Sequence, residues 1–360
     1  MRTIVTVTGI RPDFIRMSEV FKLLDKEFNH ILVHTGQHYD KMLSDVFFDE
    51  LDIREPDYNL GIGGSGKEHF HQLADVSVKL IELLRTENIC PDLILFLGDS
   101  NSALVAAPLK KEGYKIGHIE AGMRSYDKRM LEEINRICCD HCSSMLFVYH
   151  TDYKDNLLKE NITSDNIYVV GNTIVDVCDK FKKEICSSPK TNDFILMDIH
   201  RPENFNYKNR MVNIINYANK CSVLFNVPVR MLSFKRTIMK IEEYDIDLRD
   251  IQLIDLLSYK NFLREQYNSL FMISDSGTAQ EEPALLGTPV IVPRDYTERP
   301  QSEENNCSIR LDFNDDKVDA LLNKTENWLS SLGSLNLMKT DWLGDGTTAE
   351  QILFYLKRDL

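Results

Sequence analysis

Short apolar runs alternate with amphipathic helical patterns along most of the chain. Such runs, when they are bounded by polar or turn residues, are typical of strands that are buried on both faces. In the first half we predict strands at Ile4–Val7, Ile31–His34, Leu93–Leu97, Ile116–Ile119 and Met145–Tyr149. Segments with a period of about 3.6 residues separate them, and each such segment predicts a helix. This alternation predicts a parallel sheet that is covered by helices.

A second series of apolar runs follows the polar stretch Ser187–Asn192. The strands predicted here are Phe194–Met197, Val227–Met231, Ile251–Ile254, Phe271–Ile273 and Val290–Val292. We therefore expect an α/β protein with two Rossmann-like domains, residues 1–178 and 179–346, whose strand ends can face one cleft.

Three further segments complete the pattern. Pro12 stands at the first helical position after the first strand. The glycine-rich segment Gly61–Gly66 predicts a mobile loop before a helix that begins near Lys67. An amphipathic helix is expected at Thr347–Leu360.

Composition narrows the function classes. The chain has 360 residues, which suggests two domains, and 43% hydrophobic residues, which is typical of a globular protein. With 42 Lys and Arg against 56 Asp and Glu, the net charge of −14 disfavours nucleic acid and anionic membranes as partners. A phosphate ligand would therefore need a local basic pocket. We recognise no signal peptide and no apolar run approaching the roughly 20 residues of a membrane span, so we expect a soluble, cytoplasmic protein.

Eight scattered cysteines do not form the framework of a secreted domain, and we expect them to be reduced. Cys138, Cys139, His141 and Cys142 are the one cluster to consider as a metal site. The cluster lacks a second pair of ligands at zinc spacing and lies in an amphipathic helix. We interpret its members as small buried core residues and predict no metal site.

The segment Ser274–Pro300 carries the strongest single signal for a ligand. An apolar strand is followed by Ser-Asp-Ser-Gly and then by a predicted helix. Ser276 and Gly277 would present backbone N–H groups and a hydroxyl at the helix N-terminus, where a diphosphate is favoured. Glu281 and Glu282 could accept hydrogen bonds from sugar or ribose hydroxyls. The combination indicates an activated sugar, although a helix cap with acidic residues in its first turn would give the same pattern.

Acidic residues also stand where predicted strands end. Asp99 follows the strand LILFLG, and Glu120 ends the strand IGHIE. Parallel strands present their carboxyl ends at one edge, so the two carboxylates could reach one substrate, and crowding would raise at least one pKa. Glu132 is a third candidate. Read singly, each acid is more often a cap of the following helix than a catalytic group.

Basic residues stand at comparable turns. His200 ends the strand FILMDI and precedes Arg201, and both could contact a diphosphate. Arg11 lies at the first strand-to-helix turn, where its guanidinium could donate two hydrogen bonds to phosphate. Arg136 and Arg299 are weaker candidates, because arginines often lie at the surface or pair with carboxylates. A lone histidine at a strand end is usually structural.

Eight segments in order, taken together, resemble the non-hydrolysing UDP-N-acetylglucosamine 2-epimerase family. They are GIRPDFIRM, HTGQHYDKML, LGDSNSALVAA, GHIEAGMRS, EEINR, GNTIVD, HRPEN and the SDSGT segment described above, which ends at Pro300. The resemblance implies a glycosyltransferase-B-like fold and a C-terminal helix, 347–360, that packs back on the first domain. It also implies a homodimer that supplies precursors of cell-surface polysaccharides.

The same resemblance implies a reaction and a set of residues. A family member eliminates UDP to form a 2-acetamidoglucal and adds UDP back with C2 inverted, without a metal or other cofactor. By their match to the family motifs, the catalytic residues are expected to be Asp99, Glu120, Glu132 and His200. The residues expected to bind UDP are Arg11, Arg136, Arg201, Phe262, Ser276, Gly277, Glu282 and Arg299, with Phe262 stacked on uracil. The first domain would thus carry the carboxylates and the second would bind UDP.

The sequence departs from the family pattern at several positions. Arg16 replaces a lysine, Leu131 and Pro202 replace a proline and an arginine, and Arg230 replaces a histidine. The region 61–71 lacks the arginine of a regulatory UDP-sugar site, so we expect no activation by UDP-N-acetylglucosamine. The motif around Asp127 and the SDSGT segment are similar to branches that epimerise 6-deoxy-L-sugars, such as the N-acetylated UDP derivatives of L-rhamnosamine and L-fucosamine.

Three other functions remain open. A glycosyltransferase of the same architecture would transfer the sugar to an acceptor, although three carboxylates are more than transfer requires. A hydrolysing 2-epimerase would release a free sugar. A non-catalytic module would only bind the UDP-sugar.

Overall fold

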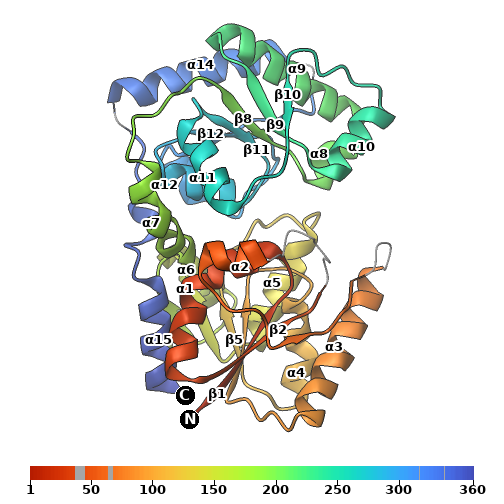
Figure 1. Ribbon diagram of the computed structural model, residues 1–360, viewed down its shortest axis with the longest axis vertical. Helices are drawn as coiled ribbons and strands as arrows, with labels where there is room; N and C mark the ends of the chain where they lie inside the picture. Colours follow the sequence, from red (N-terminus) through yellow and green to blue (C-terminus); the bar gives the residue numbers. More distant parts are fainter. Residues whose placement is uncertain (37–44, 64–67, 316, 336) are drawn as a thin grey trace. The chain divides into compact units, whose positions relative to one another are not determined.

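The computed structural model describes residues 1–36, 45–63, 68–315, 317–335 and 337–360 (Figure 1). The chain divides into two compact units. Unit 1 consists of Met1–Val177 and Leu343–Leu360, and unit 2 consists of Cys178–Trp342. None of the described helices has the length and hydropathy that crossing a membrane requires.

The described part of unit 1 contains a seven-stranded parallel sheet in the order β3-β2-β1-β4-β5-β6-β7. The strands are β1 (Thr3–Thr8), β2 (Asn29–His34), β3 (Tyr58–Asn59), β4 (Leu93–Leu97), β5 (Ile116–Ile119), β6 (Met145–Val148) and β7 (Ile167–Val169). Every residue of β4, β5 and β6 is buried, as expected for central strands with helices on both faces.

Helices connect successive strands of this sheet, and a last helix, at the C-terminal end of the chain, is added to the same unit. They are α1 (Arg11–Glu27), α2 (Asp45–Leu51), α3 (His69–Thr86), η1 (Ala103–Val105), α4 (Ala106–Lys111), α5 (Leu131–Cys142), α6 (Thr151–Lys159), η2 (Ser164–Asn166) and α15 (Thr348–Asp359). The C-terminal helix α15 packs against α1, the first helix of the same unit (Figure 1). Helix α7 (Thr173–Ile185) runs through the boundary into unit 2.

The described part of unit 2 contains a six-stranded parallel sheet in the order β10-β9-β8-β11-β12-β13. Its strands are β8 (Ile195–Asp198), β9 (Val229–Leu232), β10 (Gln252–Ile254), β11 (Met272–Ser274), β12 (Val290–Val292) and β13 (Ser308–Arg310). Its helices are α8 (Pro202–Phe205), α9 (Lys208–Phe225), α10 (Lys235–Glu243), α11 (Tyr259–Asn268), η3 (Thr278–Gln280), α12 (Glu282–Leu285), α13 (Pro300–Glu304), α14 (Val318–Leu335) and η4 (Asp341–Leu343), the last ending in unit 1.

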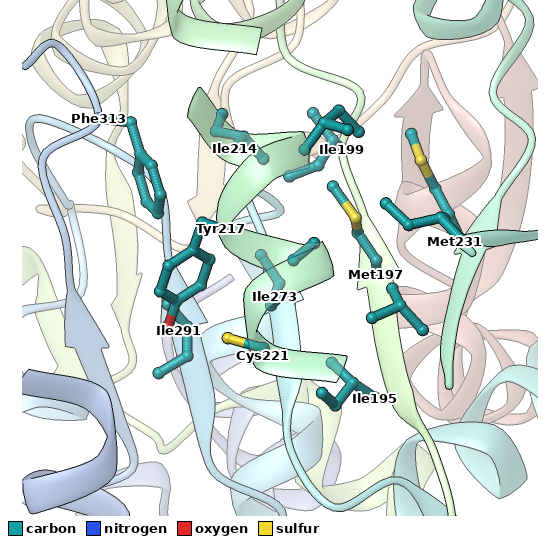
Figure 2. Packing of buried hydrophobic residues seen from close by; sticks show 14 of the residues in the cluster. Ile195, Met197, Ile199, Ile214, Tyr217, Cys221, Met231, Ile273, Ile291 and Phe313 are labelled. Carbon is teal, nitrogen blue, oxygen red and sulfur yellow. The ribbon is translucent and has the colours of Figure 1, made fainter. Parts of the chain in front are cut away.

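The core of unit 2 forms where one face of this sheet meets α9. Ile195, Met197 and Ile199 follow one another at alternate positions, so their side chains point to the same face (Figure 2). Ile214 and Tyr217 of α9 belong to the same buried cluster, with the Tyr217 ring 5.1 Å from the Phe313 ring (Figure 2). The buried Tyr217 hydroxyl bonds with Thr325 Oγ1 at 2.6 Å. This packing fixes β8, whose carboxyl end carries candidate site residues.

The predicted α/β class with two parallel sheets is confirmed, and each of the ten predicted strands is present within two residues at either end. Three short strands at sheet edges were not predicted: β3, β7 and β13.

Two local predictions differ or are only partly described. The helix expected after the Ser-Asp-Ser-Gly segment is reduced to η3 and α12, because Pro283 and the turn at Gly287 leave room for little more than one turn each. A pair of such short helices has little macrodipole. The predicted loop Gly61–Gly66 and the helix start near Lys67 fall partly outside the described residues, as does the motif His34–Leu43.

Candidate active site

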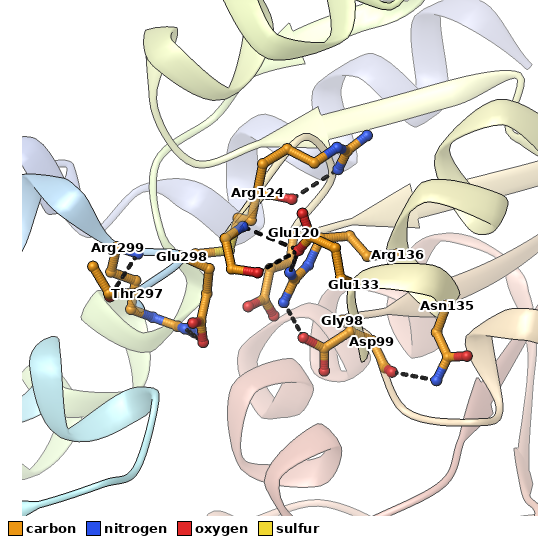
Figure 3. Close-up of polar contacts among 12 residues, drawn as sticks. Gly98, Asp99, Glu120, Arg124, Glu133, Asn135, Arg136, Thr297, Glu298 and Arg299 are labelled. Atoms are coloured by element: carbon orange, nitrogen blue, oxygen red, sulfur yellow. Dashed lines mark hydrogen bonds and ion pairs between the residues drawn. The ribbon is translucent and has the colours of Figure 1, made fainter. Parts of the chain in front are cut away.

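Asp99 and Glu120 lie just beyond the carboxyl ends of the adjacent strands β4 and β5 of unit 1 (Figure 3). The strands pair in register up to Leu97 and Ile119. A Cβ added to Gly98 would lie only 3.2 Å from Glu120 Oε2, so the two turns are in close contact. The structure therefore brings together the two strand-end acids that the sequence indicated.

Asp99 is held by helix α5. Its carboxylate forms an ion pair with Arg136, and its carbonyl accepts a hydrogen bond from Asn135 Nδ2 at 2.9 Å (Figure 3). The Asp99 side chain keeps 26% exposure, whereas Arg136 is fully buried. Asp99 can thus contact a ligand while its charge is balanced from behind.

Glu120 is buried and has an uncommon backbone conformation. It is only 2% exposed and forms an ion pair with Arg16 of α1. Its φ of 72° lies in the left-handed region, which non-glycine residues rarely adopt and which tends to persist at functional sites. The Arg16 guanidinium also lies 5.5 Å from the centre of the Tyr149 ring. An acid placed in this way is a candidate for proton transfer.

The neighbours Glu132 and Glu133 in α5 have different environments. Glu133 is buried and accepts hydrogen bonds from the backbone N–H groups of Ser125 and Tyr126, both at 3.0 Å, and from Arg136 at 2.8 Å. These bonds make Glu133 a structural anchor. Glu132 is partly exposed, and none of the hydrogen bonds and ion pairs found among the described residues involves it. It therefore remains the candidate of the pair.

Arg136 was expected to bind UDP, but in the structure it lies between Asp99 and Glu133. This is the carboxylate-paired arrangement considered as the alternative for this arginine. A contact with phosphate would have to compete with two ion pairs.

Arg11 begins α1 and is partly exposed, with its guanidinium 5.1 Å from the centre of the Phe47 ring. The adjacent turn is closed by Asp13, whose Oδ2 accepts hydrogen bonds from Gly9 N at 2.7 Å and Ile10 N at 3.1 Å. Burial raises the pKa of Asp13 to about 7 against the two hydrogen bonds that lower it, and Asp99 adds to the rise. Sequence reasoning missed Asp13, which is marked only by its position three residues after the turn.

In unit 2, His200 lies between two carboxylates at the end of β8. Its Nδ1 donates to Asp198 Oδ1 at 2.7 Å and is 3.5 Å from Asp275 Oδ1. Burial lowers the pKa of His200, but the charges of Asp198 and Asp275 outweigh burial and raise it above the usual value. The side chain is still 32% exposed. A partly exposed imidazolium of this kind can donate a proton or a hydrogen bond to a phosphate.

Asp198, His200 and Asp275 also form a group of three potential metal ligands whose atoms lie within 4.8 Å of one another. Asp275 already accepts hydrogen bonds from His200 N at 3.0 Å, Arg201 N at 3.0 Å and Asn204 Nδ2 at 2.8 Å. Because these donors occupy the lone pairs that a cation would need, the geometry favours an oriented histidine over a metal centre. Neither aspartate was among the sequence candidates, although each ends or follows a predicted strand.

Arg210 of α9 also stabilises the loop after β8. Arg210 Nε donates to Asn204 Oδ1 at 2.6 Å, and Arg210 also pairs with Asp295 at 2.9 Å. Arg201 is partly exposed, and its Nη1 is 3.7 Å from Glu203. The structure thus brings His200 and Arg201 together at one turn, as the sequence indicated.

The segment after β11 is held by side-chain contacts, whereas the sequence indicated the N-terminus of a helix. The backbone N–H of Ser276, which was expected to bind a phosphate, donates a hydrogen bond to Ser274 Oγ at 3.1 Å. A Cβ on Gly277 would lie 2.8 Å from Arg299 Nη1, so a larger residue at this position would displace the guanidinium. Arg299 is itself buried and donates to Glu281 at 2.7 Å and to Glu298 at 2.5 Å.

Glu282 and Phe262 are more enclosed than a direct ligand contact would suggest. Glu282 is 3% exposed and accepts a hydrogen bond from Gln266 at 3.1 Å. Phe262 is partly buried and packs against the small core cluster that includes Phe194 and Met272.

The cysteine cluster is only partly a core cluster. Cys139 is buried, Cys138 and Cys142 are of intermediate exposure, and all three are free thiols, while His141 is exposed. The side chains of α5 therefore correct the expectation that all four are buried. Among the described residues, this cluster forms no group with metal-binding geometry.

Comparisons with known proteins identify one family. A family model described as UDP-N-acetylglucosamine 2-epimerase matches residues 22–357. A UDP-N-acetylglucosamine 2-epimerase of Methanocaldococcus jannaschii is 33% identical over 352 residues, which cover 91% of this chain and 94% of that protein. A UDP-2,3-diacetamido-2,3-dideoxy-D-glucuronate 2-epimerase of Pseudomonas aeruginosa is 35% identical over 305 residues, covering 82% of this chain and 84% of the relative.

A solved structure gives the same result. The crystal structure of the Methanocaldococcus jannaschii UDP-GlcNAc 2-epimerase in complex with UDP-GlcNAc and UDP superposes with a TM-score of 0.88 at 31% identity. The match covers 99% of this chain and 100% of the other. The glycosyltransferase-B-like fold class that the sequence predicted is thereby confirmed.

Proposed function

The chain belongs to the UDP-N-acetylglucosamine 2-epimerase family, and we propose that it inverts C2 of a UDP-activated 2-acetamido-2-deoxy sugar without hydrolysing it. The observation that carries the proposal is the contact between the turns of Asp99 and Glu120, two acids at adjacent strand ends. A reaction that moves a proton on and off carbon requires such paired acid and base groups.

The chemistry explains why elimination is needed. C2 of the sugar ring has no adjacent carbonyl that would acidify its proton, so direct abstraction is disfavoured. In the proposed route the C1–O bond breaks with its electron pair leaving on UDP, and a base removes the C2 proton to give a 2-acetamidoglucal. UDP then adds back to C1 while an acid delivers a proton to the opposite face of C2.

We assign the proton transfers to Asp99, Glu120 and Glu132. Asp99 and Glu132 retain exposure to a ligand, whereas Glu120 is buried against Arg16. His200 is assigned to the leaving diphosphate, because Asp198 and Asp275 raise its pKa and its partly exposed ring can donate a hydrogen bond or a proton as negative charge develops on UDP.

For UDP binding we propose the set derived from the sequence. It comprises Arg11, Arg136, Arg201, Phe262, Ser276, Gly277, Glu282 and Arg299. The environments of these residues indicate that they contribute to UDP binding in different ways. Arg11 and Arg201 are partly exposed cations suited to direct phosphate contact, whereas Arg136 and Arg299 are buried among carboxylates and are better suited to hold the loops.

The substrate is a UDP-2-acetamido sugar, either UDP-N-acetylglucosamine and its manno epimer or a 6-deoxy-L analogue. The curated relatives support a choice of this breadth, because one is named for UDP-N-acetylglucosamine and another for a diacetamido glucuronate. The substrate would be identified by incubating the enzyme with UDP-GlcNAc, with the UDP derivatives of the two N-acetylated 6-deoxy-L sugars and with the UDP-diacetamido glucuronate. NMR would then show which of these sugars is epimerised. Free sugar would indicate a hydrolysing epimerase, and acceptor-dependent turnover would indicate a glycosyltransferase.

Solvent deuterium provides the mechanistic test. Product formed in heavy water is expected to carry deuterium at C2, since the acid that protonates C2 exchanges with solvent. Inverted product that keeps its original C2 hydrogen would exclude elimination with exchangeable acids.

The clamp on UDP is tested by substitution. His200→Ala and Arg11→Ala each remove a charge-assisted hydrogen bond and should weaken UDP binding by about 1.5 to 3 kcal/mol. Calorimetric titration with UDP measures this, with Arg85→Ala as the control because Arg85 is exposed and forms an ion pair with Glu112. Unchanged affinity in both test variants would place the phosphate elsewhere.

Family resemblance supports three further proposals: a homodimer, a cytoplasmic location and a role in making polysaccharide precursors. We also propose that UDP-N-acetylglucosamine is not required as an activator, since residues 61–71 contain no arginine. Hyperbolic rate curves in both directions are expected. If the rate curve is sigmoidal and becomes hyperbolic when UDP-N-acetylglucosamine is added, a regulatory site exists. Light scattering gives the oligomeric state.

A further inference from the structure

A buried histidine–aspartate pair lies behind the acids of unit 1 and is not among the residues assigned above. His118 of β5 is fully buried, and its two ring nitrogens have different partners. Nδ1 bonds with Asp140 Oδ1 at 2.7 Å, and Nε2 bonds with the carbonyl oxygen of Gly98 at 2.8 Å. One side chain therefore joins α5, β5 and the turn after β4.

The partners determine the protonation state of the ring. A carbonyl oxygen has no hydrogen to donate, so Nε2 of His118 must be the donor to Gly98. Asp140 also accepts hydrogen bonds from Gly122 N at 3.1 Å and forms an ion pair with Arg124 at 2.7 Å, and both contacts favour its charged form. A charged Asp140 requires Nδ1 to donate as well, which makes His118 an imidazolium.

The charges in this group balance. His118 and Arg124 are the cations, and Asp140 and Glu160 are the anions, with Glu160 accepting two hydrogen bonds from Arg124 at 2.8 and 2.7 Å. Burial lowers the pKa of His118, but Cys139 and Asp140 raise it by more. Burial likewise raises the pKa of Asp140, and His118 and Arg124 reverse that effect. The pair is thus a stable feature of the folded unit.

The pair fixes the backbone on both sides of the two acids. Gly98 precedes Asp99, and both its polar backbone groups are bound to β5: its N–H donates to Ile119 O at 3.0 Å, and its carbonyl accepts from His118. Gly122, two residues after Glu120, is held by Asp140. Glu120 lies between these anchors in a left-handed conformation that needs such support to persist.

We propose that His118 is a positioning residue for the epimerisation, which through the Gly98 carbonyl and Asp140 sets the separation of Asp99 and Glu120. The inference rests on the proposed function. Its chemical content is that the hydrogen bond to Gly98, and not only the buried charge pair, is needed for turnover.

Two substitutions separate these contributions. Glutamine places an N–H donor near the position of Nε2 and can keep the bond to Gly98, whereas asparagine places its donor near Nδ1 and can reach only Asp140. We expect His118→Asn to lower kcat at least tenfold with KM for the UDP-sugar within about twofold, because UDP binding is assigned mainly to other residues. His118→Gln should recover most of kcat.

The chain contains a matched control. His30 of β2 is in the same sheet, has a fully buried side chain, and bonds with Asp25 at 2.6 Å and Thr6 at 3.0 Å. His30→Asn and His30→Gln remove a buried histidine of the same sheet whose aspartate partner, Asp25, is 30% exposed and belongs to neither the turn of Asp99 nor that of Glu120. They should lower the unfolding midpoint as the His118 variants do while leaving kcat of the folded enzyme unchanged.

The outcomes are distinct. Equal kcat in His118→Asn and His30→Asn, at wild-type level, would overturn the positioning role and leave the proposed function intact. A wild-type enzyme that epimerises no UDP-sugar would overturn the proposed function itself. Should His118→Asn fail to fold, His118→Gln and NMR of the wild-type enzyme decide: two protonated ring nitrogens at pH 8 are expected, and a neutral ring would refute the arrangement.

Discussion

Asp13 shows how a single buried carboxyl can make stability depend on pH. The group closes the turn before α1 by accepting two backbone N–H groups, and it is 5% exposed. Its pKa is about 7 when folded, against 3.8 for an ordinary aspartate, chiefly because of burial. The folded chain therefore keeps a proton that the unfolded chain releases at lower pH.

The sign of the effect follows from linkage. Between pH 3.8 and about 7 the folded state binds more protons than the unfolded state, so the contribution of Asp13 to stability falls as pH rises, by at most about 1.4 kcal/mol per pH unit. Asp13→Asn lacks this term. Urea unfolding from pH 4.5 to 7.5 should show the wild type losing stability relative to the variant, and parallel curves would contradict it.

At the same scale, sequence located the acids but not the ion pairs that hold them. Asp99 and Glu120 were found because each follows an apolar strand run. Their partners come from distant segments, since Arg136 is 37 residues from Asp99 and Arg16 is 104 residues from Glu120. Only tertiary packing brings such pairs together, so no local pattern could predict them.

At the scale of elements, the turn after β5 is in close contact with helix α6 at Gly122. Gly122 has a φ of 78°, and a Cβ there would lie 2.3 Å from the carbonyl oxygen of Tyr153. Gly113 also has a positive φ, of 93°, but no heavy atom within 4 Å of its Cβ position. The two glycines separate backbone conformation from close approach.

Alanine substitutions at these positions should differ accordingly. Gly113→Ala is expected to lose about 1–2 kcal/mol of unfolding free energy for the left-handed backbone alone. Gly122→Ala should lose at least about 2 kcal/mol more, because α6 must move away from β5. Denaturant unfolding of both variants measures the difference. Equal losses would mean that the turn relaxes freely, and the anchor on Glu120 would then be weak.

Whole elements were predictable where they are long or central. The strands β4, β5 and β12 match the predicted residues because each is a continuous apolar run buried on both faces. Edge strands such as β3 and β13 have few residues and partly exposed positions, so no apolar run marks them. The short η3 and α12 were overestimated because an acidic, polar segment after a strand resembles the start of a longer helix.

For the whole molecule, the two tryptophans offer a selective probe. Trp328 lies in α14 and Trp342 is the last residue of unit 2, so both belong to that unit. Fluorescence therefore reports the unfolding of unit 2, whereas far-UV circular dichroism reports both units.

UDP should stabilise unit 2 in particular, because most of the residues proposed to bind UDP lie in that unit. At 100 times its Kd, UDP is expected to add about 2.7 kcal/mol to the unfolding free energy seen by fluorescence. The shift should shrink in His200→Ala at the same UDP concentration. Calorimetric saturation without any shift in the tryptophan transition would assign UDP to unit 1.

The division of unit 1 into two stretches of sequence has a consequence during synthesis. The chain leaves the ribosome from its N-terminus, so residues 1–177 emerge first, and all of unit 2 follows before Leu343–Leu360. The face of α1 that packs against α15 thus stays uncovered while a complete second domain is translated and can fold. A nascent chain stalled before residue 343 would present a finished second domain beside an unfinished first one, and chaperones that recognise apolar surface would be expected to bind at α1.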